Sequence, residues 1–154
     1  MKLVNLTILY TLNEPIKITR KPNFSGQIIK RKHCSFTLFS TGKIIVTGPH
    51  SFKEKLHLLQ QLFRDLNLNK IITNWKVINA VFVGKVKLIK PWYVTTSKSC
   101  LEYEPELFPA CYWRSGKYLV SLFSSGKYII TGVRNELTAH SLEKEFLRQI
   151  SDLL

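Results

Sequence analysis

The chain contains an internal repeat, and this repeat restricts its folds more than any other feature. Residues 39–48 read FSTGKIIVTG and residues 123–132 read FSSGKYIITG, so seven positions are identical at an offset of 84. The same offset aligns Phe24 with Phe108. Two copies of one unit predict a molecule with approximate two-fold symmetry, because a solenoid needs a longer series of copies.

Each repeat predicts short strands followed by one helix. β-Branched and aromatic runs flank Ser40-Thr41-Gly42 and again Ser124-Ser125-Gly126. A glycine in the last position of such a loop is typical of a three-residue hairpin. Both repeats end in an amphipathic helical pattern. We therefore expect an α+β fold with an amino-terminal repeat at 1–72 and a carboxy-terminal repeat at 73–154, together forming one domain.

The hairpin around Ser40-Thr41-Gly42 predicts one apolar and one mixed sheet face. It places Thr37 opposite Ile45, and opposite residues share a face. The apolar face then holds Phe36, Leu38, Ile44 and Val46. Two helical stripes would cover such a face, namely Phe52, Leu56, Leu59, Phe63 and Leu66 in the first repeat and Ala139, Leu142, Phe146, Ile150 and Leu153 in the second.

A second hairpin puts aromatic pairs on the mixed face. A turn at Ser115-Gly116 sets Phe108 opposite Phe123, and the equivalent turn at Arg31-Lys32 sets Phe24 opposite Phe39. One phenylalanine in a strand is usually part of a core. Four in matched pairs on a lysine-bearing face favour a functional role.

The charge of the chain predicts a polyanionic partner. Lys and Arg number 23 against 10 Asp and Glu, which gives a formal net charge of +13. An excess of this size is typical of nucleic-acid-binding proteins. The 154 residues exclude a large multidomain enzyme.

Enzyme chemistry and cofactors find little support in the residues. We recognise no glycine-rich phosphate loop, metal-ligand cluster or carboxylate pair at a useful spacing, and we expect no enzyme, no metal and no cofactor. Cys34, Cys100 and Cys111 are odd in number and lack C-x-x-C spacing, which favours reduced intracellular thiols. No window predicts a membrane span or a signal peptide.

Three features together resemble the TATA-box-binding protein family. They are YEPELFP at 103–109, the doubled F-S-[ST]-G-K-x-I-[VI]-T-G motif, and the strand residues Asn5 and Asn79. The resemblance covers nearly the whole chain. It implies a pseudo-two-fold saddle of two repeats, with a curved antiparallel sheet and helices on its convex face. It further implies a general transcription initiation factor that binds and bends A·T-rich promoter DNA through the minor groove.

The resemblance also assigns roles to particular residues of this sequence. Those matching the DNA-intercalating positions are Phe24, Phe39, Phe108 and Phe123. Those matching minor-groove positions are Asn5, Asn79, Val81, Ile45, Thr47, Ile129 and Thr131. Those matching phosphate contacts are Lys30, Lys43, Arg114 and Lys127. Those matching the surface for a transcription factor IIB-like partner are Glu104, Glu106 and Leu107.

These residue types suit the minor groove. A·T and T·A pairs present only acceptors there, so asparagine amides can recognise both, and a guanine amino group would clash with threonine or isoleucine on the groove floor. Phenylalanine wedges unstack a base step at a cost that the larger contact with bent DNA offsets; the TATA-binding protein is the established example of this behaviour.

Several departures from the family pattern indicate a compact, divergent member. The paired phenylalanines are only 15 positions apart in each repeat, and Thr7, Thr37 and Ser121 make the groove-facing surface more polar. About ten residues fewer before Phe24 than in the second repeat predict a shortened first helix. A viral source or a reduced genome would fit this compactness, and we expect a nuclear location, or a virus factory or virion for a viral protein.

Two alternatives remain open beside the promoter factor. One is a nucleic-acid-binding module of the same fold without promoter function, such as the substrate-gripping domain of some nucleases. The other is a protein-interaction adaptor that no longer binds DNA. The expected partners are double-stranded DNA, a transcription factor IIB-like factor and RNA polymerase machinery, with no membrane. An exposed apolar face would also favour a homodimer of the free protein.

Overall fold

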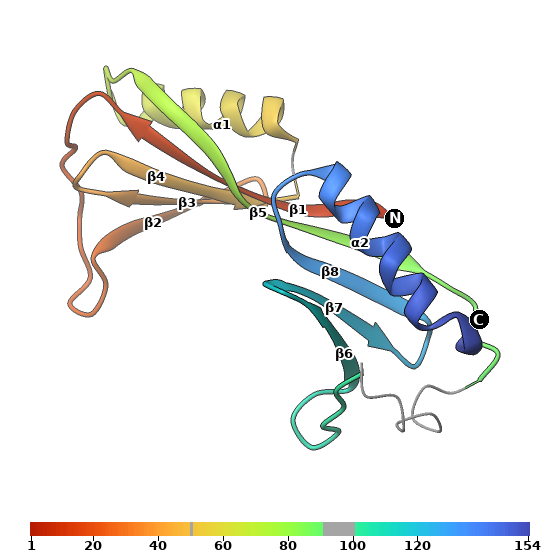
Figure 1. Cartoon of the computed structure of the whole chain (residues 1–154). Coiled ribbons are helices and arrows are strands. Elements are labelled where there is room, and N and C mark those ends of the chain that lie inside the picture. Colours follow the sequence, from red (N-terminus) through yellow and green to blue (C-terminus); the bar gives the residue numbers. More distant parts are fainter. Residues whose placement is uncertain (50, 91–100) are drawn as a thin grey trace. The chain divides into compact units, whose positions relative to one another are not determined.

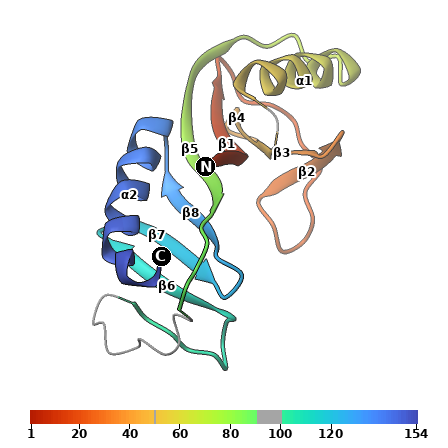
Figure 2. The ribbon, with the colours of Figure 1, turned by 90° about the vertical axis from the view of Figure 1, so that its right-hand side faces the viewer.

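The computed structural model describes residues 1–49, 51–90 and 101–154 (Figure 1). The chain forms two compact units. The N-terminal unit comprises Asn5–Asn79, and the C-terminal unit comprises Met1–Val4 with Ala80–Leu154. In each unit a helix lies over one face of antiparallel strands, which confirms the expected α+β class (Figures 1 and 2).

The N-terminal unit has the strand order β2-β3-β4-β1. Its elements are β1 (Lys2–Leu12), β2 (Gly26–Arg31), β3 (Cys34–Phe39), β4 (Lys43–Gly48) and α1 (Phe52–Asp65). The C-terminal unit has the order β5-β8-β7-β6. Its elements are β5 (Ile72–Lys85), β6 (Ala110–Ser115), β7 (Tyr118–Phe123), β8 (Lys127–Val133), α2 (Glu136–Gln149) and a short 3-10 helix at Ser151–Leu153. Strands β1 and β5 contribute residues to both units.

The three-residue hairpin is confirmed in both repeats. Gly42 and Gly126 have φ angles of 89° and 79°, the left-handed region that glycine enters without steric cost. Thr37 pairs with Ile45 as expected. All four residues of the predicted apolar face are buried, since Phe36, Leu38, Ile44 and Val46 are each at most 1% exposed.

The register of the second hairpin was predicted wrongly in both repeats. Gly26 lies opposite Phe39 and Ala110 lies opposite Phe123, so neither first phenylalanine is a direct cross-strand partner of the second. The turns fall one residue later than expected, at 32–33 and at 116–117. A shift of the pairing by two residues leaves every side chain on its predicted face, because side chains alternate along a strand.

The physical reason lies in the turn geometry. Lys32 and His33 both have positive φ, 43° and 63°, as a type I′ turn requires, and Gly116 supplies a φ of 57° as the first turn residue. Such turns match the twist of the flanking strands. In the first hairpin this match outweighs the poor preference of lysine and histidine for positive φ.

The two helices supply most of the apolar cover. Ser51 and Glu54 form a capping box at the start of α1. The second stripe is fully confirmed, since all five of its members are buried. The first is corrected at its end, because α1 ends at Asp65 and Leu66 is 39% exposed, whereas Leu62 and Lys55 are buried.

The segment between β1 and β2 contains no helix. We expected a shortened helix there, but residues 13–25 cross the edge of the unit in extended and turn conformations. Backbone bonds hold the segment, with Ile16 N–H donating to the Ser40 carbonyl at 3.0 Å and Asn13 N–H to the Ile71 carbonyl at 2.9 Å. The missing residues thus remove the whole helix.

Two of the three cysteines are buried in the core. These are Cys34 and Cys111, whereas Cys100 lies outside the described residues. No helix in the described part of the chain has the length and apolar character that a membrane crossing requires.

Replacing Tyr10 by phenylalanine should stabilise the fold. The ring of Tyr10 is fully buried, and its hydroxyl has no hydrogen-bond partner among the described residues. Tyr10→Phe keeps the packing and removes a buried unsatisfied group, so we expect the free energy of unfolding in urea to rise by about 1 kcal/mol. Tyr118→Phe, at a half-exposed site, serves as the control and should change it by less than about 0.5 kcal/mol.

The stability advantage of Tyr10→Phe over the wild type should increase at alkaline pH. Burial, with a smaller contribution from the Cys34 thiol, raises the pKa of Tyr10 from its ordinary value of 10.0 to about 12. Between those two values the unfolded chain loses the phenolic proton and the folded chain keeps it, so the wild type loses stability as the pH rises. Tyr10→Phe lacks this loss. A variant less stable than the wild type at neutral pH would show that the hydroxyl is satisfied.

Candidate nucleic-acid interface

One face of the sheet in the N-terminal unit is left open by α1. Along β3 and β4 the buried residues alternate with half-buried ones, and the half-buried ones include Thr37, Phe39, Ile45 and Thr47. Because side chains alternate between the two faces of a strand, the half-buried ones face away from α1. The predicted minor-groove residues Ile45 and Thr47 therefore lie on an accessible face.

The C-terminal unit repeats this arrangement. Ile129 and Thr131 on β8 are half-buried, whereas Tyr128 and Ile130, which alternate with them, are buried. Val81 on β5 is also half-buried. Ser121 differs from its counterpart Thr37, because it is 9% exposed and counts among the buried residues.

The four predicted wedge residues form two close ring pairs. The Phe24 and Phe39 ring centroids lie 6.4 Å apart, and those of Phe108 and Phe123 lie 5.9 Å apart in an edge-on arrangement. Phe24 is 40% exposed and Phe108 is 38% exposed. Large apolar rings kept this exposed in pairs indicate a surface that meets an apolar partner.

Small residues let the rings meet in spite of the shifted register. Gly26 lies opposite Phe39, and a Cβ atom built on it would be 3.0 Å from Cε1 of Phe24. Phe24 therefore folds back over the glycine. Ala110 takes the equivalent place opposite Phe123. We did not single out these two residues from the sequence, although the offset of 84 relates them.

Tyr112 and Ile28 extend the aromatic pairs and were also missed. The Tyr112 ring stacks on Phe108 at 5.5 Å with an interplanar angle of 21°. Ile28, at the corresponding position of the first repeat, is 54% exposed. The offset again relates the two, and each widens the apolar surface next to a wedge.

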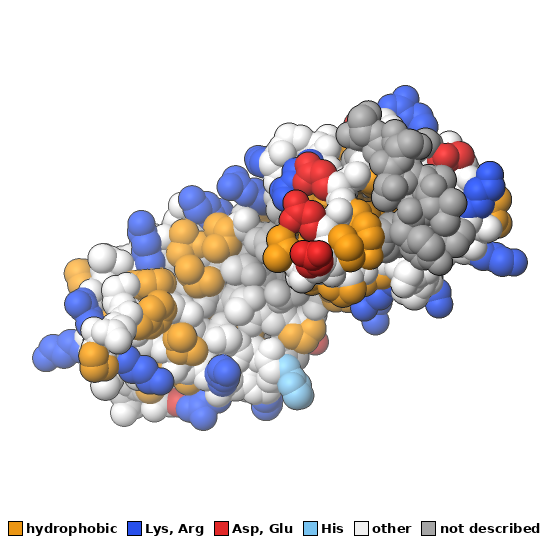
Figure 3. Space-filling view, turned by 90° about the horizontal axis from the view of Figure 1, so that it is seen from below, with side chains coloured by type: hydrophobic (Ala, Val, Ile, Leu, Met, Phe, Trp, Pro, Cys, Tyr) orange, Lys and Arg blue, Asp and Glu red, His pale blue; other side chains and the backbone are white. Residues whose placement is uncertain are grey.

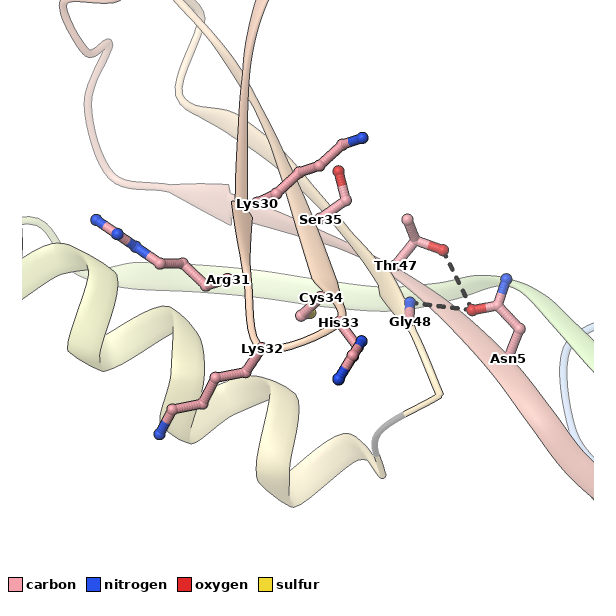
Figure 4. Close-up of a pocket in the computed structure, with 9 residues that line it drawn as sticks. All are labelled: Asn5, Lys30, Arg31, Lys32, His33, Cys34, Ser35, Thr47 and Gly48. Atoms are coloured by element: carbon pink, nitrogen blue, oxygen red, sulfur yellow. Dashed lines mark hydrogen bonds between the residues drawn. The ribbon is translucent and has the colours of Figure 1, made fainter.

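The side chain of Asn5 is held in one orientation. Its Oδ1 accepts hydrogen bonds from the Gly48 N–H at 3.0 Å and from the Thr47 hydroxyl at 3.3 Å (Figure 4). Because the Gly48 N–H can only donate, the amide oxygen must face it and the amide NH2 must face the other way. Thr7 joins the same network through a 2.9 Å bond to Thr47. The threonine at position 7 therefore has a structural partner.

A basic cavity opens beside this network. It has a volume of about 500 Å³. Its lining comprises Asn5, Lys30, Arg31, Lys32, His33, Cys34, Ser35, Thr47 and Gly48 (Figure 4). Four consecutive residues of the β2–β3 hairpin that can carry positive charge thus contribute to the lining, although the Arg31 guanidinium also lies 3.9 Å from the Asp65 carboxylate. Such a cavity favours an anionic group.

The other predicted phosphate contacts differ in their surroundings. Lys43 and Lys127 are exposed at the starts of β4 and β8. Arg114 donates through Nε to the Glu102 carboxylate at 3.2 Å, and both side chains are more than half exposed. An ion pair this exposed is weak, so a phosphate can compete for Arg114.

The predicted partner surface is an exposed turn that leads into a wedge. Glu104, Glu106 and Leu107 are all exposed, and Leu107 is 78% exposed. The Glu104 carbonyl accepts from the N–H groups of Leu107 and Phe108 at 3.0 Å each. In the space-filling view, acidic side chains gather beside hydrophobic ones in one region of the surface (Figure 3). The turn therefore carries two exposed acidic side chains close to Phe108 in the sequence.

Within the described ranges, no group of three or more His, Cys, Asp or Glu residues is arranged to hold a metal ion. The remaining predicted residue, Asn79, lies half-buried on β5.

The fold and the two open faces together define a class of protein. Its members are two-repeat α+β molecules that carry paired phenylalanines on an uncovered, basic sheet face.

Comparison with known proteins identifies the family. Residues 74–153 match the model of the family described as transcription factor TFIID, or TATA-binding protein. The chain is 28% identical to the TATA-box-binding protein of Aeropyrum pernix over 126 residues, which are 75% of this chain and 60% of that protein. It is 32% identical to the TATA-box-binding protein of Pyrococcus furiosus over 123 residues, which are 73% of this chain and 63% of that protein. The chain thus spans less than two thirds of either relative.

The solved structure of the Methanococcus jannaschii TATA-binding protein shares the fold. It superposes with a TM-score of 0.85 over 98% of both chains, at 23% sequence identity. The chain therefore belongs to the TATA-binding protein family.

Proposed function

We propose that this protein binds A·T-rich duplex DNA through the minor groove and bends it, as a general transcription initiation factor. Membership of the TATA-binding protein family supports this proposal. The observation that carries it is the presence of two phenylalanine pairs, one in each unit, in which one ring is exposed and the other is half-buried. Unstacking a base step costs a few kcal/mol, and two rings side by side supply the apolar surface that offsets this cost.

Asparagine amides and the shape of the aliphatic surface would together recognise the base edges on the floor of the minor groove. The Asn5 amide directs its donor end away from Gly48, and A·T and T·A pairs both present acceptors in the minor groove. Ile45, Ile129 and Val81 are half-buried and leave no space for a guanine amino group. We therefore propose recognition of A·T content, with Asn79 acting as Asn5 does in the other repeat.

Phosphate contacts should make the binding depend strongly on salt. We expect the double variant Lys43→Gln with Lys127→Gln to reduce the slope of log K against log[salt] by about 2, because each lost contact removes roughly 0.9. Lys144→Gln, on the exposed side of α2, is the matched control and should leave the affinity nearly unchanged and the slope within about 0.3 of the wild type. The slope is measured by fluorescence anisotropy from 50 to about 300 mM salt.

An unchanged slope in the double variant would contradict the phosphate role of these lysines. A slope near zero in the wild type would favour the protein-interaction adaptor instead.

We further propose that the turn with Glu104, Glu106 and Leu107 docks a transcription factor IIB-like partner after DNA has bound. Its exposure and its position next to Phe108 support this role. Recruitment of RNA polymerase machinery would follow, in a nucleus or at a virus factory. A homodimer of the free protein through the open apolar faces belongs to the same proposal.

Selection of bound duplexes from a random pool at near-physiological salt tests the DNA-binding function. We expect enrichment of A·T-rich sites with flexible pyrimidine–purine steps, because such steps kink most easily. Recovery of G·C-rich sites, or no enrichment, would contradict the proposal. A promoter-independent binding module of the same fold would enrich A·T-rich duplexes but would not bind the partner.

A further inference from the structure

Lys55 is a buried cation in the first helix of the chain. Its side chain is 0% exposed, and its Nζ donates a hydrogen bond to the Gly48 carbonyl at 2.7 Å. Burial lowers its pKa, whereas the neighbouring Cys34 and Glu54 act in the opposite direction. Burying an ammonium group is costly, so its retention here calls for a role.

Gly48 connects this ammonium group to the open face. Its carbonyl accepts from Lys55, and its N–H donates to Asn5 Oδ1 at 3.0 Å. The glycine has a φ of 153°, and a Cβ atom on it would lie 2.8 Å from the His33 carbonyl oxygen. The strand end is thus packed against the neighbouring hairpin and bonded to Asn5 (Figure 4). The bond from Lys55 connects it to α1 as well.

The second repeat has no amine at this position. The offset of 84 that relates the repeats places Ala139 where Lys55 stands, and Ala139 is buried in α2. The contact to Gly48 is therefore particular to the N-terminal unit.

We infer that Lys55 is a positioning residue for Asn5. From the helix side of the unit it fixes the carbonyl of the Gly48–Pro49 peptide. The close packing of Gly48 against the His33 carbonyl passes this constraint to the Thr47–Gly48 peptide, whose N–H fixes the amide of Asn5 with its donor end toward the minor groove. Through this chain of bonds Lys55 strengthens the discrimination between A·T and G·C pairs at the base step that Asn5 reads. The DNA-binding part of this inference rests on the proposed function.

The first test needs no DNA. Lys55→Met keeps the length of the side chain and removes the ammonium group, and Lys53→Met removes an exposed charge from the same helix as the control. We expect hydrogen exchange at the Gly48 amide to rise about tenfold relative to Val46 in Lys55→Met, which corresponds to ~1.4 kcal/mol. We also expect the Asn5 side-chain amide resonances to shift. Lys53→Met should change neither.

Unchanged Gly48 exchange and Asn5 resonances in Lys55→Met would overturn the inference. Should this variant not fold, the wild type still provides a test. Its Lys55 ammonium protons should exchange slowly enough to be detected by NMR, because they are buried and hydrogen-bonded, and rapid exchange would overturn the inference.

The second test distinguishes positioning from general packing. The ratio of affinities for A·T and G·C duplexes is measured for Lys55→Met, for Asn5→Ala and for the double variant. We expect Lys55→Met to reduce the ratio by about fivefold or more, as for loss of part of one base contact, and to have no further effect in the Asn5→Ala background. Additive effects would overturn the inference. If the wild type binds no DNA, the proposed function fails, while the exchange test still decides the role of Lys55.

Discussion

The double variant Phe108→Ala with Phe123→Ala should no longer bend DNA, although it should fold normally. These rings lie 5.9 Å apart on the open face, and Phe108 is 38% exposed. Without them no apolar group replaces the lost stacking at the opened base step, so the kink becomes too costly. We expect energy transfer between dyes at the ends of the duplex to stay near the value of free DNA, and affinity to fall at least about tenfold.

Two controls accompany this variant. Leu137→Ala removes an apolar side chain that is 82% exposed on α2, and it should leave bending and affinity unchanged. The melting temperature of the double variant should fall by only a few degrees, because the buried face of its unit is intact. Normal bending by a folded double variant would show that the rings are not wedges.

The second large effect concerns the hairpin glycine of the C-terminal unit. A Cβ atom on Gly126 would lie 2.1 Å from the Val86 carbonyl oxygen, and the φ of this residue is 79°. Gly126→Ala must therefore displace a backbone segment as well as adopt a strained φ. We expect the free energy of unfolding to fall by about 3 kcal/mol or more.

Gly116 offers a matched control for the backbone strain alone. Its φ is 57°, yet a Cβ atom on it would meet nothing within 4 Å. Gly116→Ala should cost about 1 kcal/mol, the usual penalty for a left-handed residue other than glycine. Both values come from urea unfolding. Equal costs for the two variants would mean that the contact with Val86 contributes nothing.

The sequence predicted the faces of the sheet well because the signal for them is local. The glycines at 42 and 126 define three-residue hairpins, and strict alternation then determines which side chains share a face. This placed Thr37 opposite Ile45 and brought the four phenylalanines to the open side. The doubled motif repeated each inference independently.

The hairpin register could not be predicted in the same way. The turn at Lys32-His33 contains no glycine, asparagine or aspartate, so neither candidate turn was chemically favoured. The place opposite Phe39 also needs a small residue, since the Phe24 ring occupies the space above Gly26. That requirement arises only in the folded structure, where the Phe24 ring, which precedes β2, lies against the Phe39 ring of β3.

Lys55 shows a different limit. Position 55 falls on the same helical stripe as Phe52 and Leu59, where a lysine is normally expected to be solvated. Its partner is the backbone carbonyl of Gly48. Every residue has such a carbonyl, so the sequence does not indicate which one accepts the bond. A lysine within an apolar stripe nevertheless indicates that a hydrogen-bond acceptor lies close to it in the core.

Base substitution in a bound duplex tests the central claim most directly. Inosine·C pairs show the major groove of G·C pairs but lack the guanine amino group in the minor groove. We predict that a site in which all A·T pairs are replaced by inosine·C binds within about threefold of the A·T site, whereas the G·C version binds at least about tenfold more weakly. Equal weakening by inosine·C and G·C would contradict recognition through the minor groove.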